Sequence, residues 1–221
     1  MQKKINNKLL ISIILASLAF AGFLTLFIMV LCKYNFAIDG FNYFVANNRN
    51  NILSGFFKIF THLGSFYTLA LLTIVGVILI WFVFKNKRLA IFSVLAFAVT
   101  AVANFVIQQI VRRARPLNLA IISETGFSFP SGHAMMSFAV FGLLVYFAYK
   151  FIKNKPLKIA IVSLGVVVIM LIGFSRIYLG VHYLTDIIAG WCVSLFILIL
   201  TILFYNSQIL RFGCKNKKDT Q

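Results

Sequence analysis

The stretch GFSRIYLGVHYLTDIIAG, residues 173–190, holds three side chains capable of chemistry within an apolar surrounding: Arg176, His182 and Asp186. Arginine keeps its charge and presents several donors in one plane, which suits the oxygens of a phosphate group. His182 and Asp186 are four residues apart, so on a helix the carboxylate lies beside the imidazole. A carboxylate that holds one ring nitrogen fixes the tautomer and leaves the other nitrogen as a nucleophile or base.

A second polar stretch, FSFPSGHAMMSF, covers residues 127–138. Pro130 and Ser131 precede a long apolar run, a pattern that predicts a helix start with Ser131 near the cap. The free N–H groups and the positive dipole end of such a start favour an anion, and Gly132 lets the backbone approach it closely. We expect His133 to lie beside that anion in the first turn.

The third polar stretch is NFVIQQIVRRARPL, residues 104–117. On a helix, Asn104, Gln108 and Arg115 fall on one stripe, and a polar stripe is costly in lipid, so we expect it to face the bundle interior. Pro116 is expected to end this helix. For Asn104, a bond to another helix and a part in the site are equally good interpretations.

The elements that must position these residues are apolar. The chain has 221 residues, is 62% hydrophobic and has a mean hydropathy of +0.98, whereas soluble domains are typically about 45–50% apolar. These values indicate an all-α integral membrane protein with a single domain over residues 1–221. Runs long enough to span, alone or with their flanks, cover residues 9–31, 66–84, 89–111, 131–149, 157–174 and 183–205. Residues 52–63 are too short to span and are predicted to form a helix along the interface.

The distribution of positive charge predicts the orientation of this six-span bundle. Of the 21 Lys and Arg residues, 14 fall in the set of loops that includes both termini. By the positive-inside rule both termini are cytoplasmic, and the three polar clusters face the outside of the cell membrane. The net charge of +17 then reflects topology and does not indicate nucleic-acid binding.

Brought together at one face, the clusters supply two arginines, Arg115 and Arg176, a helix start, two histidines and one aspartate. This set suits a bound phosphate that one imidazole attacks while the other protonates the leaving oxygen. In phosphoryl transfer the charge of the transition state is spread over the equatorial oxygens, so fixed donors are the main requirement.

The other polar residues of this face have simpler interpretations. Apart from Asp186 the external carboxylates are Asp39 and Glu124, too few to form a metal site, so we expect no metal and no cofactor. His62 has no partner in sequence and is interpreted as a surface or interface residue. Arg113 is interpreted as a lipid-headgroup or surface cation.

Three motifs in this order carry a family resemblance. RARP at 113–116, PSGH at 130–133 and SRIYLGVHYLTD at 175–186 resemble the three-part signature of the type 2 phosphatidic acid phosphatase (PAP2) family, particularly its bacterial membrane lipid phosphatases. With the six spans, the resemblance extends from about residue 60 to 205.

The resemblance implies a role for each matching residue. His182 matches the nucleophile that forms a phosphohistidine, Asp186 the aspartate that orients it, and His133 the acid for the leaving group. The phosphate-binding positions are Arg115, Arg176, Ser131 and Gly132.

One position departs from the family pattern. The first motif usually begins with lysine seven residues before the arginine of its Arg-Pro pair, and here that position is Gln108. Glutamine can donate to a phosphate oxygen without charge, which is worth about 0.5–1.5 kcal/mol against about 1.5–3 for a charged donor. We therefore expect Gln108 to bind phosphate more weakly, unless Arg112 or Arg113 reaches the same oxygen.

The predicted function is a membrane phosphatase acting on a lipid phosphate or diphosphate: undecaprenyl diphosphate, phosphatidylglycerophosphate or phosphatidate. A lipid phosphotransferase with the same intermediate is the alternative, because the motifs do not distinguish water from a lipid acceptor. A non-catalytic lipid-phosphate binder or transporter is a weaker third hypothesis, favoured only by Gln108. The sequence leaves the oligomeric state open.

Overall fold

Six long helices follow the six predicted apolar segments in a computed structural model that describes residues 7–218. The ends of the predicted domain, residues 1–6 and 219–221, lie outside the described residues. The long helices are α1 (Asn7–Leu31), α4 (Phe66–Phe84), α5 (Lys87–Val111), α6 (Gly132–Phe151), α7 (Lys155–Tyr178) and α8 (Leu184–Lys218). The short ones are η1 (Ala37–Gly40), α2 (Phe41–Asn47), α3 (Asn51–Phe60), η2 (Thr61–Gly64) and η3 (Leu117–Leu119).

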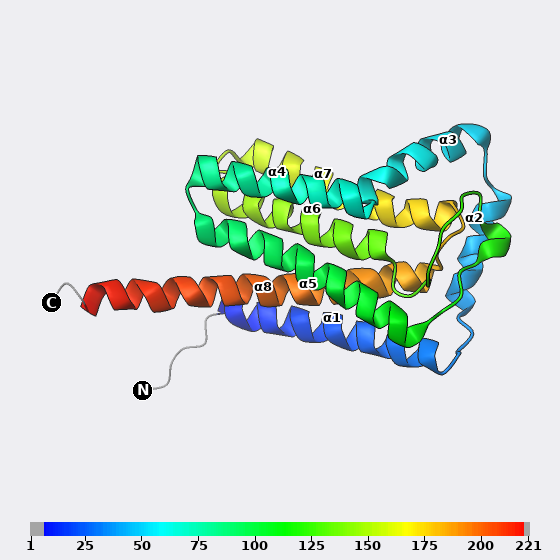
Figure 1. The fold of residues 1–221 in the computed structure, drawn as a ribbon, viewed down its shortest axis with the longest axis horizontal. Helices are drawn as coiled ribbons and strands as arrows, with labels where there is room; N and C mark the ends of the chain where they lie inside the picture. The colour runs from blue at the N-terminus through cyan, green and yellow to red at the C-terminus, as the bar shows by residue number, and fades with distance from the viewer. Residues whose placement is uncertain (1–6, 219–221) are drawn as a thin grey trace.

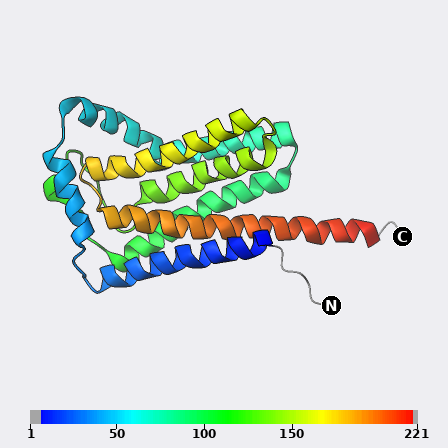
Figure 2. The ribbon, with the colours of Figure 1, turned by 180° about the vertical axis from the view of Figure 1, so that it is seen from behind.

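The long helices run side by side, and the short elements gather at one end of the bundle (Figure 1). Helix α6 packs on α7, α8 and α5, while α8 also packs on α1, so α6 and α8 form the centre. The view from behind shows α8 extending past the other helices at the end opposite the short elements (Figure 2).

Helix starts are marked in the sequence by polar caps. The side chain of Ser131 accepts from Ala134 N at the start of α6, as predicted from the Pro-Ser pair. Asn86 and Asn154 cap α5 and α7 in the two tight turns opposite the short elements. Each cap satisfies an N–H that has no partner within its own helix.

The surface of the bundle fits a membrane. Five helices are long and apolar enough to cross one, and a sixth span results if the bent pair Asn51–Gly64 and Phe66–Phe82, at 50°, counts as one. Large apolar side chains such as Leu18, Val102 and Leu164 are exposed on the outside, where water would be unfavourable. The all-α, multi-pass membrane fold is thus confirmed.

The segment predicted to lie along the interface is helical. It forms α3 and η2, and Phe57 packs its ring 4.7 Å from that of Tyr178 and 5.5 Å from that of Phe174 on α7. Its depth in the membrane remains a prediction.

The helix end predicted at Pro116 is wrong. Helix α5 ends at Val111, because Arg112 takes the left-handed conformation with φ of 49°. Residues 113–131 then return across the bundle end as a loop with one short helical turn. Arg115 therefore does not share a helical stripe with Asn104 and Gln108.

Candidate functional site

His182 lies in the turn that joins α7 to α8, and it is 1% exposed. Backbone bonds from Leu179 N to Ser175 O and from Val181 N to Arg176 O fold this turn back on α7. The His182 carbonyl accepts from the side chain of the buried Asn42 on α2 at 2.7 Å. The backbone of His182 is therefore held both by the bonds within the turn and by the side chain of Asn42.

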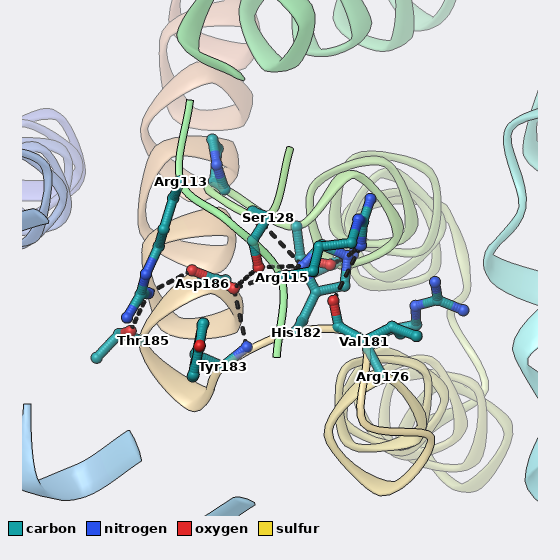
Figure 3. Close-up of polar contacts among 12 residues, drawn as sticks. Arg113, Arg115, Ser128, Arg176, Val181, His182, Tyr183, Thr185 and Asp186 are labelled. Carbon is teal, nitrogen blue, oxygen red and sulfur yellow. Dashed lines mark hydrogen bonds and ion pairs between the residues drawn. The ribbon is translucent and has the colours of Figure 1, made fainter. Parts of the chain in front are cut away.

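Each ring nitrogen of His182 has a short contact with a different partner (Figure 3). Nε2 lies 2.9 Å from Nη1 of Arg115, and Nδ1 lies 2.8 Å from the backbone carbonyl of Ser128. Since arginine can only donate and a carbonyl can only accept, the hydrogen is assigned to Nδ1 and the lone pair to Nε2. Nε2 is therefore the atom available for attack.

Asp186, in the first turn of α8, lies between His182 and Arg113 (Figure 3). One carboxylate oxygen accepts from Ser128 Oγ and from Tyr183 N at 2.8 Å, and is 3.5 Å from Nδ1 of His182. The predicted pairing of Asp186 with His182 is thus present but longer than the bond to the Ser128 carbonyl. Ser128 shares the orienting role that the sequence interpretation gave to Asp186 alone.

The interpretation of Arg113 as a surface or headgroup cation is wrong. Its side chain is 16% exposed and bonds Asp186 at 2.6 Å, Asp39 at 2.7 Å and the Thr185 hydroxyl at 2.7 Å. Burial opposes its charge, but Asp186 and Asp39 outweigh that effect and raise its pKa. The sequence held a signal for these ion pairs: Asp39 and Asp186 were predicted to lie at the same membrane face as Arg113.

Arg115 reaches His182 from the 113–131 loop. Besides Nε2 of His182 it donates to the carbonyls of Val181 at 3.0 Å, Gly126 at 3.1 Å and Thr125 at 3.0 Å. Arg115 was predicted to lie on a helical stripe, but it is the 113–131 loop that holds its guanidinium at the ring of His182.

Arg176, in the last turn of α7, is 1% exposed and donates to Thr61 Oγ1 at 2.7 Å. Its other terminal nitrogen pairs with Glu124 from the loop. The Nε atom is buried and has no hydrogen-bond partner among the described residues. A phosphate oxygen would satisfy this donor, as predicted for Arg176.

The start of α6 closes the site. Ser131 N donates to the Asp186 carbonyl at 3.2 Å, which ties α6 to α8. His133, in the first turn, packs against Gly64, where an added Cβ would lie 3.0 Å from its ring. Arg176, Arg115 and His182 all lie close enough to His133 for their charges to act on it.

The predicted polar stripe of α5 supports the backbone of that helix start. Asn104 and Gln108 both donate to the Pro130 carbonyl, at 3.1 and 3.0 Å. Asn104 also lies 2.9 Å from where a Cβ on Gly132 would be, so a larger residue would disturb this approach. Gln108 thus has a structural partner, and its predicted contact with phosphate stays a prediction.

Burial is the main influence on the charge of His182. It lowers the pKa of His182 to about 4, although the hydrogen-bonded Asp186 acts in the opposite direction; the nearby Arg115 and Arg176 add to the lowering. The imidazole is therefore neutral near pH 7, as a nucleophile requires. Among the described residues no group of three or more His, Cys, Asp or Glu side chains is placed to hold a metal ion; independence from metals stays a prediction.

Comparisons with known proteins show the family of this chain. The profile of the PAP2 superfamily matches residues 89–209, more than half of the chain. Phosphatidylglycerophosphatase B of Bacillus subtilis (strain 168) is 32% identical over 169 residues, covering 75% of this chain and 79% of that protein. The undecaprenyl-diphosphatase of Sulfolobus acidocaldarius is 30% identical over 124 residues, covering 53% and 56%.

A solved structure shows the same fold. The crystal structure of the transmembrane PAP2 type phosphatidylglycerolphosphate phosphatase from Bacillus subtilis superposes with a TM-score of 0.72 at 26% identity, covering 86% of this chain and 96% of that one. The chain therefore belongs to the PAP2 superfamily and is a multi-pass membrane phosphatase of that family.

Proposed function

We propose that the protein hydrolyses the terminal phosphate of a membrane lipid phosphate or diphosphate through a phosphohistidine at His182. The observation that carries this proposal is the unprotonated Nε2 of His182, whose lone pair is held toward Arg115 by the Nδ1–H bond to the Ser128 carbonyl. An attacking nitrogen with fixed orientation and no proton is the requirement for in-line transfer.

In the first step Nε2 of His182 attacks phosphorus, and the bond to the leaving oxygen breaks. Protonated His133 gives its proton to that oxygen, so the lipid leaves as a neutral alcohol or a protonated phosphate. Arg115, the Nε of Arg176 and the α6 start stabilise the charge on the equatorial oxygens. Water then attacks phosphorus and gives a proton to His133, the bond between phosphorus and Nε2 breaks with its electron pair returning to His182, and phosphate is released.

Phosphatidylglycerophosphate, undecaprenyl diphosphate and phosphatidate are the proposed substrates. The names of the relatives in Bacillus subtilis and Sulfolobus acidocaldarius favour the first two. The turn between α7 and α8, which carries His182, lies at the end of the bundle where the short elements gather (Figure 1). The outside of the helices is apolar, so a lipid in the bilayer would approach this end from the side. From the positive-inside count we place this end outside the cell membrane and both termini in the cytoplasm.

The test is phosphate release by the purified protein in detergent with EDTA, against these three lipids and a water-soluble phosphate ester. We expect turnover of a lipid by the wild type and none by His182→Ala. The exposed His62 gives the matched control, His62→Ala, which should keep full activity. Labelled phosphate that passes to an added lipid alcohol instead of water would indicate a phosphotransferase. The absence of any turnover by folded wild-type protein would overturn the proposal.

A further inference from the structure

Asp39 connects a remote segment to the catalytic end. It lies in η1, between α1 and α2, and its side chain is 10% exposed. Its carboxylate accepts from Thr185 N at 3.0 Å and from the Thr185 hydroxyl at 3.0 Å. Thr185 is in the first turn of α8, whose N–H groups have no partner within the helix, so Asp39 caps α8 from another part of the chain.

Arg113 is held between two carboxylates. Its two terminal nitrogens bond Asp39 at 2.7 Å and Asp186 at 2.6 Å, and its guanidinium lies 4.1 Å from the ring centre of Tyr183. Charge-assisted bonds from both terminal nitrogens and a cation–π contact with one ring leave this guanidinium little freedom. The position of Arg113 in turn fixes the carboxylate oxygen of Asp186 that does not face His182.

The charges along this chain of contacts alternate. Arg113 alone would neutralise Asp186 and weaken its support for a positive charge on the His182 ring. Asp39 compensates the charge of Arg113, so the group of three keeps one net negative charge beside the imidazole. That charge is needed when His182 gives up its lone pair to phosphorus.

We propose that Asp39 is a positioning residue for the reaction, acting through Arg113 and Thr185 on the catalytic Asp186. This inference rests on the proposed function, in which His182 is the nucleophile. Within the part of the chain that the structure describes, the Asp39 side chain bonds to Arg113 and Thr185 and has no hydrogen bond or ion pair with Arg115, Arg176 or the start of α6. Its removal should therefore lower kcat and leave phosphate binding intact.

The first experiment compares Asp39→Asn with the wild type in the phosphate-release assay. We expect kcat to fall about 10- to 100-fold, the effect usual for a second layer of hydrogen-bonded partners. KM and the inhibition constant of inorganic phosphate should not change. Asp39→Glu, which keeps the charge, should recover part of the lost kcat.

The second experiment asks whether Asp39 acts through Arg113. In a double-mutant cycle with Arg113→Gln, the Asp39→Asn substitution should lower kcat less than it does in the wild type, because the contact with Arg113 is already gone and only that with Thr185 remains. Arg112→Gln is the matched control, since the exposed Arg112 donates to the Gln109 carbonyl of its own helix end. Thermal unfolding of each variant shows whether a lower kcat comes from a loss of folded protein or from a slower reaction.

The outcomes are distinct. Three results would overturn the positioning role. Asp39→Asn could keep the wild-type kcat, the two substitutions could have additive effects in the cycle, or kcat could fall only in proportion to the loss of folded protein. If the wild type is active and His182→Ala is inactive, each of these results contradicts only the role of Asp39 and leaves the proposed function standing. Activity that survives in His182→Ala, or an inactive wild type, overturns the proposed function and this inference with it.

Discussion

Arg115 donates to Nε2 of His182 at 2.9 Å, so an arginine lies on the lone pair that attacks phosphorus in the proposed mechanism. Phosphorus can reach Nε2 only after this bond is exchanged for one between Arg115 and a phosphate oxygen. The carbonyls of Val181, Gly126 and Thr125 hold the rest of the guanidinium, so a small movement is enough. Arg115 thus marks the place of the substrate before it binds.

Replacing Arg115 should therefore reduce catalysis strongly. Loss of one charge-assisted bond to the transition state is worth about 1.5–3 kcal/mol, so Arg115→Gln should lower kcat/KM by about 10- to 150-fold. Arg115→Lys keeps the charge but loses the planar guanidinium, so its kcat/KM should lie between those of the wild type and Arg115→Gln. Steady-state phosphate release measures both, with Arg112→Gln as the neighbouring control. Equal activity of Arg115→Gln and the control would exclude a role for Arg115 in the transition state.

The ion pair between Arg176 and Glu124 leads us to expect a substitution that strengthens anion binding. Glu124 is 26% exposed on the loop and occupies one terminal nitrogen of the buried Arg176. A substrate phosphate must compete with this carboxylate, so Glu124→Gln should bind anions more tightly, because the neutral amide competes less well. The measurement is the inhibition constant of inorganic phosphate, expected to fall several-fold. An unchanged or higher constant would show that Glu124 does not compete for Arg176.

The buried neutral His182 predicts a dependence of stability on pH. Its pKa is about 4 in the folded protein because of burial, against about 6.5 when unfolded. Between these values the unfolded chain binds more protons, so stability falls as the pH drops from 6.5 to 4 and changes no further below that. The full effect is about 3 kcal/mol, from about 1.4 kcal/mol for each pKa unit.

Thermal unfolding of the wild type and His182→Gln in detergent between pH 4 and 7 tests this dependence. As the pH is lowered through this range, the melting temperature of the wild type should fall more than that of His182→Gln. His62→Gln serves as the control, because His62 is exposed and should leave the pH dependence unchanged. Parallel curves for the wild type and His182→Gln would show that His182 is not held neutral by burial.

The fold and the motif residues could be predicted because their signals are local. Apolar run length gives the spans, and Pro130 with Ser131 gives the start of α6. The contacts of Arg113 could not be predicted, since they depend on Asp39, which is 74 residues away in the chain. Ser128 was missed for a related reason: its decisive contact with His182 is through a backbone carbonyl, which carries no residue-type signal.

The predicted stripe on α5 was wrong for a different reason. Proline is a strong signal for a helix end, but the left-handed Arg112 ends the helix earlier. A non-glycine residue in that conformation has weak sequence preference. Asn104 and Gln108 remained on the helix and Arg115 was carried into the loop, yet all three still serve the same end of the bundle.

The turn that carries His182 depends on Gly180, and this gives a last, matched prediction. Gly180 has φ of +75°, and a Cβ there would lie 2.0 Å from the Leu119 carbonyl oxygen. Gly126 has the same φ of +75° but open space around its Cβ position. Gly126→Ala should therefore cost only the conformational strain of about 1–2 kcal/mol. Gly180→Ala should cost clearly more, because backbone must move as well.

That movement would also displace the catalytic histidine, which follows Gly180 by two residues. The Ile121 N–H bond to the Leu179 carbonyl at 3.0 Å, beside this contact, ties the loop to the turn and should weaken with it. We therefore expect Gly180→Ala to lower both the melting temperature and the kcat of the folded fraction, whereas Gly126→Ala lowers mainly the former. Thermal unfolding and phosphate release on the two variants side by side give the answer. Equal melting temperatures would mean that strain at φ alone, and not the approach of Leu119, makes glycine necessary at position 180.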